Sequence, residues 1–333
     1  MDFRFTETQI LFAEATKEML VSECTPSKLR EMIQNSQGTI PELWGNLASI
    51  GVLGMTGPEE AGGLGMTDID HVLIMEELGQ VICPETVLEH TAIGIPFLTK
   101  YGAEKIGDDL LAAFISGEMR ISAGLGNPYV LGADCADYLL MRNMDEMHLV
   151  PSGETTLTFQ KSVDETRRLF QVDWEPSKKS RIVKSNQIIE ETMLSATVAA
   201  AAQCVGVANH LLAETINYVK EREQFGKPVG VNQAIKHHLA DTGKAIEFAR
   251  PMVHRAAWAI SNNDNDKTPP AMAKYLASKA VDLACRTALQ CHGAIAYTIE
   301  YDLQLWMKRG WALSASWGDA NAQRDKIATN LQV

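Results

Sequence analysis

The stretch YVKEREQFGKPVG, from Tyr218 to Gly230, separates a long alanine-rich helical pattern from a second helical pattern. Within it, Arg222, Gln224 and Phe225 supply a guanidinium, an amide and an aromatic ring beside a Gly-x-Pro turn. Arginine binds phosphate oxygens bidentately, an amide reads the edge of a ring, and phenylalanine stacks on a flat ring. These side chains predict a site for an anion that is attached to an aromatic ring. The structural alternative is a solvated, charged helix end that glycine and proline terminate.

Length, composition and charge are those of a large soluble globular protein. The 333 residues are 46% hydrophobic and 22% charged, which suffices for a core between two or three packed layers. The sequence contains no run of about 18 apolar residues, so no membrane span is predicted. The amino-terminal segment does not resemble a secretory signal. A net charge of −12 argues against nucleic acid as a partner, because phosphate contacts need a basic surface.

The cysteines indicate a reducing compartment. They form no C-x-x-C pair and are scattered through apolar helical patterns, so we expect reduced core residues of a cytoplasmic protein, with no disulfide frame and no metal site. The six are Cys24, Cys83, Cys135, Cys204, Cys285 and Cys291.

Residues 1–118 carry helical patterns. Thr6 and Gln9 predict a capping box ahead of a first helix, and apolar spacing predicts helices from Pro41 to Ile50 and from Asp68 to Gly79. The segment 51–67 between them contains six glycines and a proline, which predict a tight, irregular loop. It lacks the Lys-Ser/Thr pair of a phosphate-binding P-loop.

The pattern changes over residues 119–185. The runs RISAGL, ADYLLMRN, EMHLVP, TTLTFQ and RLFQVDW alternate between apolar and polar residues and are separated by turn residues. Such short runs predict strands, so we expect a small antiparallel sheet or barrel here.

Residues 186–333 return to long helical patterns. The segment 197–213 is so rich in alanine and glycine that neighbouring helices can approach its backbone closely, and further helices are predicted over 233–257 and 271–290. Helices of this length predict an antiparallel bundle. The sequence therefore predicts a mainly α protein with a small β domain: an amino-terminal helical domain (1–118), a reduced middle β-domain (119–185) and a carboxy-terminal helical bundle (186–333).

A second motif, QCHGAIAYTIEYD, spans Gln290 to Asp302. Together with R-x-Q-F-G-x-P at 222–228, PEEAGGLG at 58–65 and EELG at 76–79, it resembles the motifs of the acyl-CoA dehydrogenase flavoproteins, in the same order along the chain. The resemblance covers nearly the whole chain except 119–183, and its motifs are specific when taken together.

This resemblance implies FAD as the cofactor. It assigns Arg222, Gln224 and Phe225 to holding the dinucleotide end of the flavin, with Gln290 and Gly293 as a second clamp. Ala294 and Ala296 replace two glycines of the family motif, so the backbone must approach the cofactor differently there. His292 also fits a half-buried histidine at a helix end, and Glu300 fits a capping or ion-pairing residue of the next helix.

The family activity is α,β-desaturation of an acyl-CoA. A base removes the α-hydrogen as a proton, N5 of the flavin takes the β-hydride, and electrons leave to an electron-transferring flavoprotein. The base is a carboxylate in a dry pocket, with its pKa raised towards the working pH. Trp317 and Ala196 occupy the two positions where the family places it. Asp319 lies two residues later and is the candidate catalytic residue, although it also fits the N-cap of the following helix.

The middle region departs from the family as well. Full-length members hold the isoalloxazine ring and the thioester with T/S-E-P-x-A-G-S-D and K-x-W/Y-I-T/S-N segments, and neither segment is present. Asn127-Pro128 is at most a remnant of the first. A complete flavin pocket within this one chain is therefore not expected.

A short chain with these features resembles the small subunits of heteromeric acyl-CoA dehydrogenases that act in bacterial breakdown of steroid side chains. The resemblance implies a homologous dehydrogenase chain as partner, an α2β2 heterotetramer, a flavin at the interface, and a base on the partner. It also implies a steroid-derived CoA thioester as substrate and a bacterial cytoplasmic location. Two alternatives stay open: a self-sufficient homo-oligomer with Asp319 as base, and a non-catalytic scaffold subunit without flavin.

Overall fold

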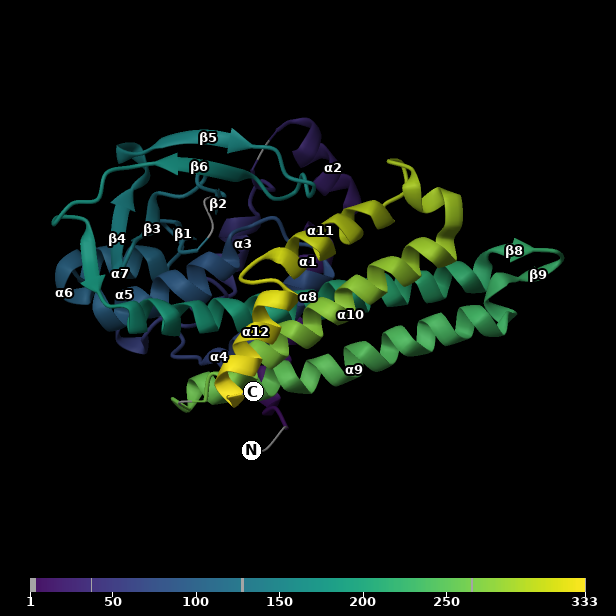
Figure 1. Ribbon diagram of the computed structural model, residues 1–333. Helices are drawn as coiled ribbons and strands as arrows, with labels where there is room; N and C mark the ends of the chain where they lie inside the picture. The colour runs from purple at the N-terminus through teal and green to yellow at the C-terminus, as the bar shows by residue number, and fades with distance from the viewer. Residues whose placement is uncertain (1–3, 37, 127–128, 265, 333) are drawn as a thin grey trace.

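The computed structural model describes residues 4–36, 38–126, 129–264 and 266–332, so Asn127 and Pro128 lie outside the described residues. Three regions follow one another along the chain, and Figure 1 shows the strands of the middle region gathered at one end of a long bundle of helices. The amino-terminal region is helical and packs beside α8. Its elements are α1 (Glu7–Glu23), α2 (Pro26–Gln34), α3 (Leu43–Ser49), η1 (Glu59–Ala61), α4 (Asp68–Gln80), the π-helix η2 (Glu89–Gly94), α5 (Ile95–Tyr101), α6 (Ala103–Ile106) and α7 (Asp108–Ile115).

The helix ends follow the local signals of the sequence. Thr6 caps α1 with the reciprocal bonds of a capping box, in which the Gln9 side chain accepts from the Thr6 backbone at 2.8 Å. The glycine-rich segment between α3 and α4 folds back on itself, and a Cβ on Gly63 would lie only 2.2 Å from the carbonyl oxygen of Gly57. The predicted irregular loop is therefore present, and its glycines allow two backbone segments to touch.

Two small sheets form the middle region. The first sheet has the order β1-β3-β4-β7, and the second has the order β2-β6-β5. Among the described pairings of these two sheets, only β1 with β3 is parallel, which differs from the antiparallel sheet expected from the sequence. The alternation of apolar and polar residues indicates which face of a strand is buried, but it does not indicate whether the neighbouring strand runs parallel or antiparallel. The strands are β1 (Ile121–Gly124), β2 (Tyr129–Leu131), β3 (Tyr138–Asn143), β4 (Glu146–Pro151), β5 (Thr156–Gln160), β6 (Leu169–Asp173) and β7 (Arg181–Lys184), with the 3-10 turn η3 (Ser152–Glu154).

Long helices form the carboxy-terminal bundle. The alanine-rich α8 runs through its centre, and a Cβ on Gly206 would lie 2.0 Å from the Glu76 carbonyl oxygen of α4. The expected close approach of neighbouring backbones is thus confirmed. The elements are α8 (Asn186–Glu221), the hairpin of β8 (Glu223–Gln224) and β9 (Lys227–Pro228), η4 (Val229–Val231), α9 (Gln233–Ser261), α10 (Thr268–His292), η5 (Gly293–Tyr297), α11 (Leu303–Ala315) and α12 (Ala320–Leu331).

Helix α8 is also the one described helix that is long and apolar enough to cross a membrane. Of its most apolar window, 72% is buried within the protein. This burial identifies α8 as the core helix of the bundle, and the apolar composition is explained by packing on all sides.

Candidate functional site

The hairpin β8–β9 carries the first group of predicted site residues. Arg222 is the C-cap of α8, where its backbone leaves the helical conformation. Phe225 and Gly226 both have positive φ, which turns the chain back towards η4, and the Phe225 side chain is 100% exposed. Figure 1 shows the hairpin projecting beyond the ends of α8 and α9, away from the strands of the middle region. The three predicted flavin-holding side chains thus extend into solvent.

The second predicted clamp lies at the same end of the bundle. Gln290 is exposed on the last turn of α10, and Gly293 ends that helix with φ 67°. The Tyr218 ring stacks on His292 with ring centroids 4.1 Å apart, and the Tyr218 hydroxyl donates to the His292 carbonyl at 3.3 Å. The ends of α8 and α10 are therefore fixed to each other.

His292 is more deeply buried than the sequence suggested. Its ring is 4% exposed, and its Nδ1 lies 2.8 Å from the Ala288 carbonyl oxygen, so Nδ1 carries the proton and donates it. Burial lowers its pKa, which keeps the ring neutral. Its Nε2 has no partner among the described residues. His292 acts as the stacking support of Tyr218 at this end of the bundle.

The exposed side chains at this end match the chemistry of a dinucleotide. No hydrogen bond or ion pair of the Arg222 guanidinium is found among the residues that the structure describes, so its donors remain available. A Cβ on Gly293 would meet no atom of this chain within 4 Å, which leaves its backbone open to a ligand. A guanidinium fork, a free aromatic face and an open glycine fit the phosphates and the adenine of FAD. These groups are exposed to solvent at the end of the bundle that is away from the strands of the middle region.

A cavity of about 310 Å³ lies at the other end of the molecule, where the three regions meet. It is bordered by η2, by β1, β2 and β6, by the first turns of α8, and by the turn between α11 and α12. From Met193 in its wall to Arg222, α8 extends for about 44 Å at 1.5 Å per residue. The hairpin and the cavity of one chain are thus too far apart to hold the two ends of one dinucleotide.

The turn between α11 and α12 contains the expected positions of the catalytic base. Trp317 borders the cavity and has φ 56°, an unusual conformation for a bulky side chain. Asp319 is the N-cap of α12, and its Oδ1 accepts from the Ala322 backbone at 2.8 Å. The second family position, Ala196, is fully buried in α8. Asp319 is exposed and does not border the cavity.

Buried charges that the sequence did not reveal lie where the three regions meet. Asp164 and Arg309 form an ion pair of 2.5 Å, in which both side chains are almost completely buried. Burial alone would raise the pKa of Asp164, but Arg309 and the hydroxyl of Thr166 lower it. Glu89, from η2, is 4% exposed, and burial raises its pKa against the opposing effect of Arg167. The sequence around Glu89, TVLEHTAIGIPFL, is largely apolar, and this composition is the signal that could have indicated a buried carboxylate.

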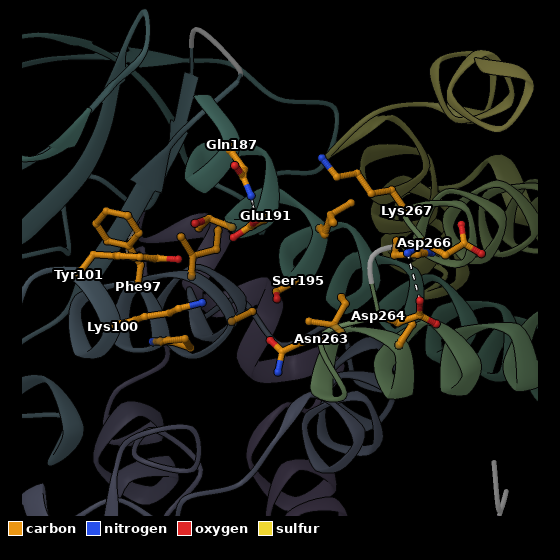
Figure 2. A pocket seen from close by; sticks show the side chains of 18 residues that line it. Phe97, Lys100, Tyr101, Gln187, Glu191, Ser195, Asn263, Asp264, Asp266 and Lys267 are labelled. Atoms are coloured by element: carbon orange, nitrogen blue, oxygen red, sulfur yellow. Dashed lines mark hydrogen bonds between the residues drawn. The ribbon is translucent and has the colours of Figure 1, made fainter. Parts of the chain in front are cut away.

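A second cavity, of about 390 Å³, lies on the far side of η2 and of the first turns of α8. Figure 2 shows its three walls: Phe97, Lys100 and Tyr101 from α5, Glu191 and Ser195 from α8, and the loop from α9 to α10. In these walls Gln187 donates to Glu191 at 2.8 Å, and the Asp266 backbone donates to Asp264 at 3.1 Å. Acidic and basic side chains alternate around it, so it does not select one sign of charge.

Comparisons with known proteins agree with this architecture. Residues 6–118 match the acyl-CoA dehydrogenase N-terminal domain, and residues 187–332 match the acyl-CoA dehydrogenase C-terminal domain. The chain is 30% identical over 328 residues to acyl-CoA dehydrogenase IpdE2 of Mycolicibacterium smegmatis, covering 98% of this chain and 99% of the relative.

Solved structures share the fold along the whole chain. The ChsE4-ChsE5 complex from Mycobacterium tuberculosis superposes with a TM-score of 0.89 at 22% identity, covering 100% of this chain and 99% of the other. The Tcur3481-Tcur3483 steroid ACAD superposes with a TM-score of 0.88 at 23% identity, covering 98% of both chains. Structures with this fold include complexes with FAD. The chain therefore belongs to the acyl-CoA dehydrogenase family of FAD-dependent oxidoreductases.

Proposed function

We propose that this chain is one subunit of a heteromeric acyl-CoA dehydrogenase and completes a flavin site that it shares with a homologous partner chain. Arg222, Gln224 and Phe225 bind the dinucleotide end of the flavin, and Gln290 with Gly293 forms the second clamp. The partner supplies the catalytic base. When bound, FAD provides the hydride acceptor for α,β-desaturation of the acyl-CoA thioester.

The observation that supports this proposal is the distance, within one chain, between the hairpin and the cavity beside the expected base positions. About 44 Å of α8 lies between the cavity wall at Met193 and the hairpin at Arg222. The hairpin projects away from the strands of the middle region, and its predicted flavin-holding side chains are exposed. Such side chains gain partners only when a second chain brings a cofactor to them.

The residues at the base positions also support a base on the partner. Trp317 and Ala196 cannot accept a proton, and the carboxylate of Asp319 is engaged as a helix cap outside the cavity. A self-sufficient enzyme would need Asp319 to leave its cap and to reach across Trp317. The scaffold alternative without flavin does not explain why Arg222 and Phe225 are left without intrachain partners.

Steroid-derived CoA thioesters are the proposed substrate class. Two chains that share this fold come from the ChsE4-ChsE5 complex and the Tcur3481-Tcur3483 steroid ACAD. An α2β2 assembly, electron transfer to an electron-transferring flavoprotein and a cytoplasmic location are proposed on the same analogy.

Flavin retention in the assembled complex tests the proposal. The chain is co-expressed with its partner dehydrogenase chain as wild type and as Arg222→Ala, and the flavin Kd is measured by equilibrium dialysis. Loss of one charged, bidentate contact costs about 1.5–3 kcal/mol, so we expect the flavin to bind about 10–100 times more weakly.

Arg142→Ala is the matched control, because Arg142 is an exposed arginine of β3 in the middle region, far from the hairpin. It should leave the flavin Kd unchanged. If Arg222→Ala and Arg142→Ala complexes bind flavin equally well, the shared-site proposal fails and the scaffold alternative gains support.

A further inference from the structure

The cavity between the three regions contains a cation whose donors are largely unused. Arg167 lies in its wall and donates from Nη1 to the Ser316 hydroxyl at 3.0 Å. A guanidinium has five N–H donors, and no other hydrogen bond of the Arg167 side chain is found among the described residues. Its side chain is half-buried, although it lies between the three regions, because part of it borders the cavity. The free donors therefore face space that a ligand can enter.

The charges that border this cavity have a positive sum. Arg167 and Lys326 are cationic, and Glu89 is the one acidic residue among those that border it. Burial raises the pKa of Glu89, against the opposing effect of Arg167. The whole chain, in contrast, carries a net charge of −12. A cationic cavity in an acidic protein is suited to an anion.

Neighbouring residues hold Arg167 in place. Asp164 and Glu89 attract it electrostatically, but no salt bridge of Arg167 is found among the described residues. The adjacent Arg309 is already paired with Asp164, and it also donates to the hydroxyl of Thr166 at 2.6 Å. Ser316 accepts from Arg167 and donates to the Ala312 carbonyl oxygen at 2.6 Å. Burial, followed by Arg309, lowers the pKa of Arg167, so an added anion would relieve an unfavourable environment.

The rest of the cavity wall is largely apolar, which favours an anion that also has an apolar part. The large uncharged side chains of the wall include Leu125, Leu131, Leu169, Met193 and Trp317. About 310 Å³ is at the small end of the range for ligand pockets. Inorganic phosphate would leave these apolar walls without contacts, whereas a carboxylate with an apolar body would use both parts of the cavity.

We propose that this cavity binds a small organic carboxylate, whose charged group pairs with Arg167 and whose apolar body lies against Met193 and Trp317. The inference rests on the proposed function in one respect, because the flavin held at the hairpin leaves this cavity free for another ligand. Glu89 acts as a repulsive neighbour that limits how tightly the anion is held.

Isothermal titration calorimetry of the assembled complex tests this inference, with cyclohexanecarboxylate as the probe. We expect binding at the wild-type cavity, at least tenfold weaker binding in Arg167→Gln, and several-fold weaker binding in Lys326→Gln. Glu89→Gln should bind the probe several-fold more tightly, because it removes the repelling charge. A merely structural role of Glu89 would not produce tighter binding. Arg142→Gln, the same change at an exposed arginine outside the cavity, should match wild type.

Three results would overturn the inference. One is an unchanged Kd in both Arg167→Gln and Glu89→Gln, and another is equal binding of the uncharged cyclohexanecarboxamide. The third is displacement of the probe by inorganic phosphate at comparable concentration, which would assign the site to phosphate. Flavin content, measured on the same samples, should not change in Arg167→Gln. Failure of the shared flavin site would appear in Arg222→Ala, and failure of this inference would appear only in the probe titrations.

Discussion

The carboxylate of Asp319 could act as a catalytic base or as the N-cap of α12. Its Oδ1 accepts from Ala322 at the start of α12, which asparagine can also do as an N-cap. Asp319→Asn therefore keeps the cap and removes the carboxylate that could accept a proton at this position. We expect the assembled enzyme with Asp319→Asn to keep kcat within about twofold of wild type, because removal of a true catalytic base costs about 10²–10⁴-fold.

Asp319→Ala gives the complementary readout. Loss of the cap should lower the free energy of unfolding by about 1 kcal/mol, measured by urea denaturation, again with little change in kcat. A loss of kcat of a hundredfold or more in Asp319→Asn would contradict the partner-supplied base and would favour the self-sufficient enzyme.

Some individual residues could be predicted from sequence because their neighbours form a motif. Arg222 and Phe225 stand in a compact signature at a helix end, and the structure leaves both side chains available to a ligand. No comparable sequence motif marks Arg167. It is next to Arg168 in a charged run that reads as solvated surface, and only the packing of three distant segments encloses it.

The π-helix η2 is an element whose buried polar residues connect the amino-terminal region with the middle region. His90, within it, accepts from the Ile121 backbone of β1 at Nδ1 and donates from Nε2 to the Phe114 carbonyl of α7. Burial lowers the pKa of His90 to about 4 from 6.5. The unfolded chain therefore binds more protons than the folded one between these two values, and stability falls as the pH falls through this window.

His90→Gln should remove this part of the pH dependence. Wild type is expected to lose about 2 kcal/mol more than His90→Gln in free energy of unfolding when the pH is lowered from 7 to about 5. Urea denaturation at the two pH values measures the difference. His237→Gln, at an exposed histidine of α9, is the control and should follow wild type. Equal pH dependence in His90→Gln and wild type would show that His90 is not held neutral by the fold.

The sequence patterns predicted some helices and strands better than others. Apolar periodicity placed α4, α9 and α10 with ends close to those observed, because each helix buries one continuous stripe. The π-helix was not predicted, since a single widened turn leaves no periodic signal over six residues. The parallel pairing of β1 with β3 was also missed, because strand direction depends on tertiary connections.

At the scale of the whole molecule, buried pairs hold the three regions in one arrangement. Arg309 of α11 pairs with Asp164 of the middle region and donates to the Cys83 carbonyl of the amino-terminal region at 2.8 Å. Such a link across more than a hundred residues has no local signature. The order of the three regions and their helical or strand character were predictable from composition, but the cavity at their junction was not, because it depends on these long-range contacts.

The central claim is that one chain contributes only part of a flavin site. Its most direct test is the flavin content, by absorbance and protein concentration, of the chain purified alone and co-expressed with its partner dehydrogenase chain. The shared-site account predicts a colourless protein alone and a yellow complex that contains fewer flavins than chains. A protein that is yellow alone, with one flavin per chain, would contradict it.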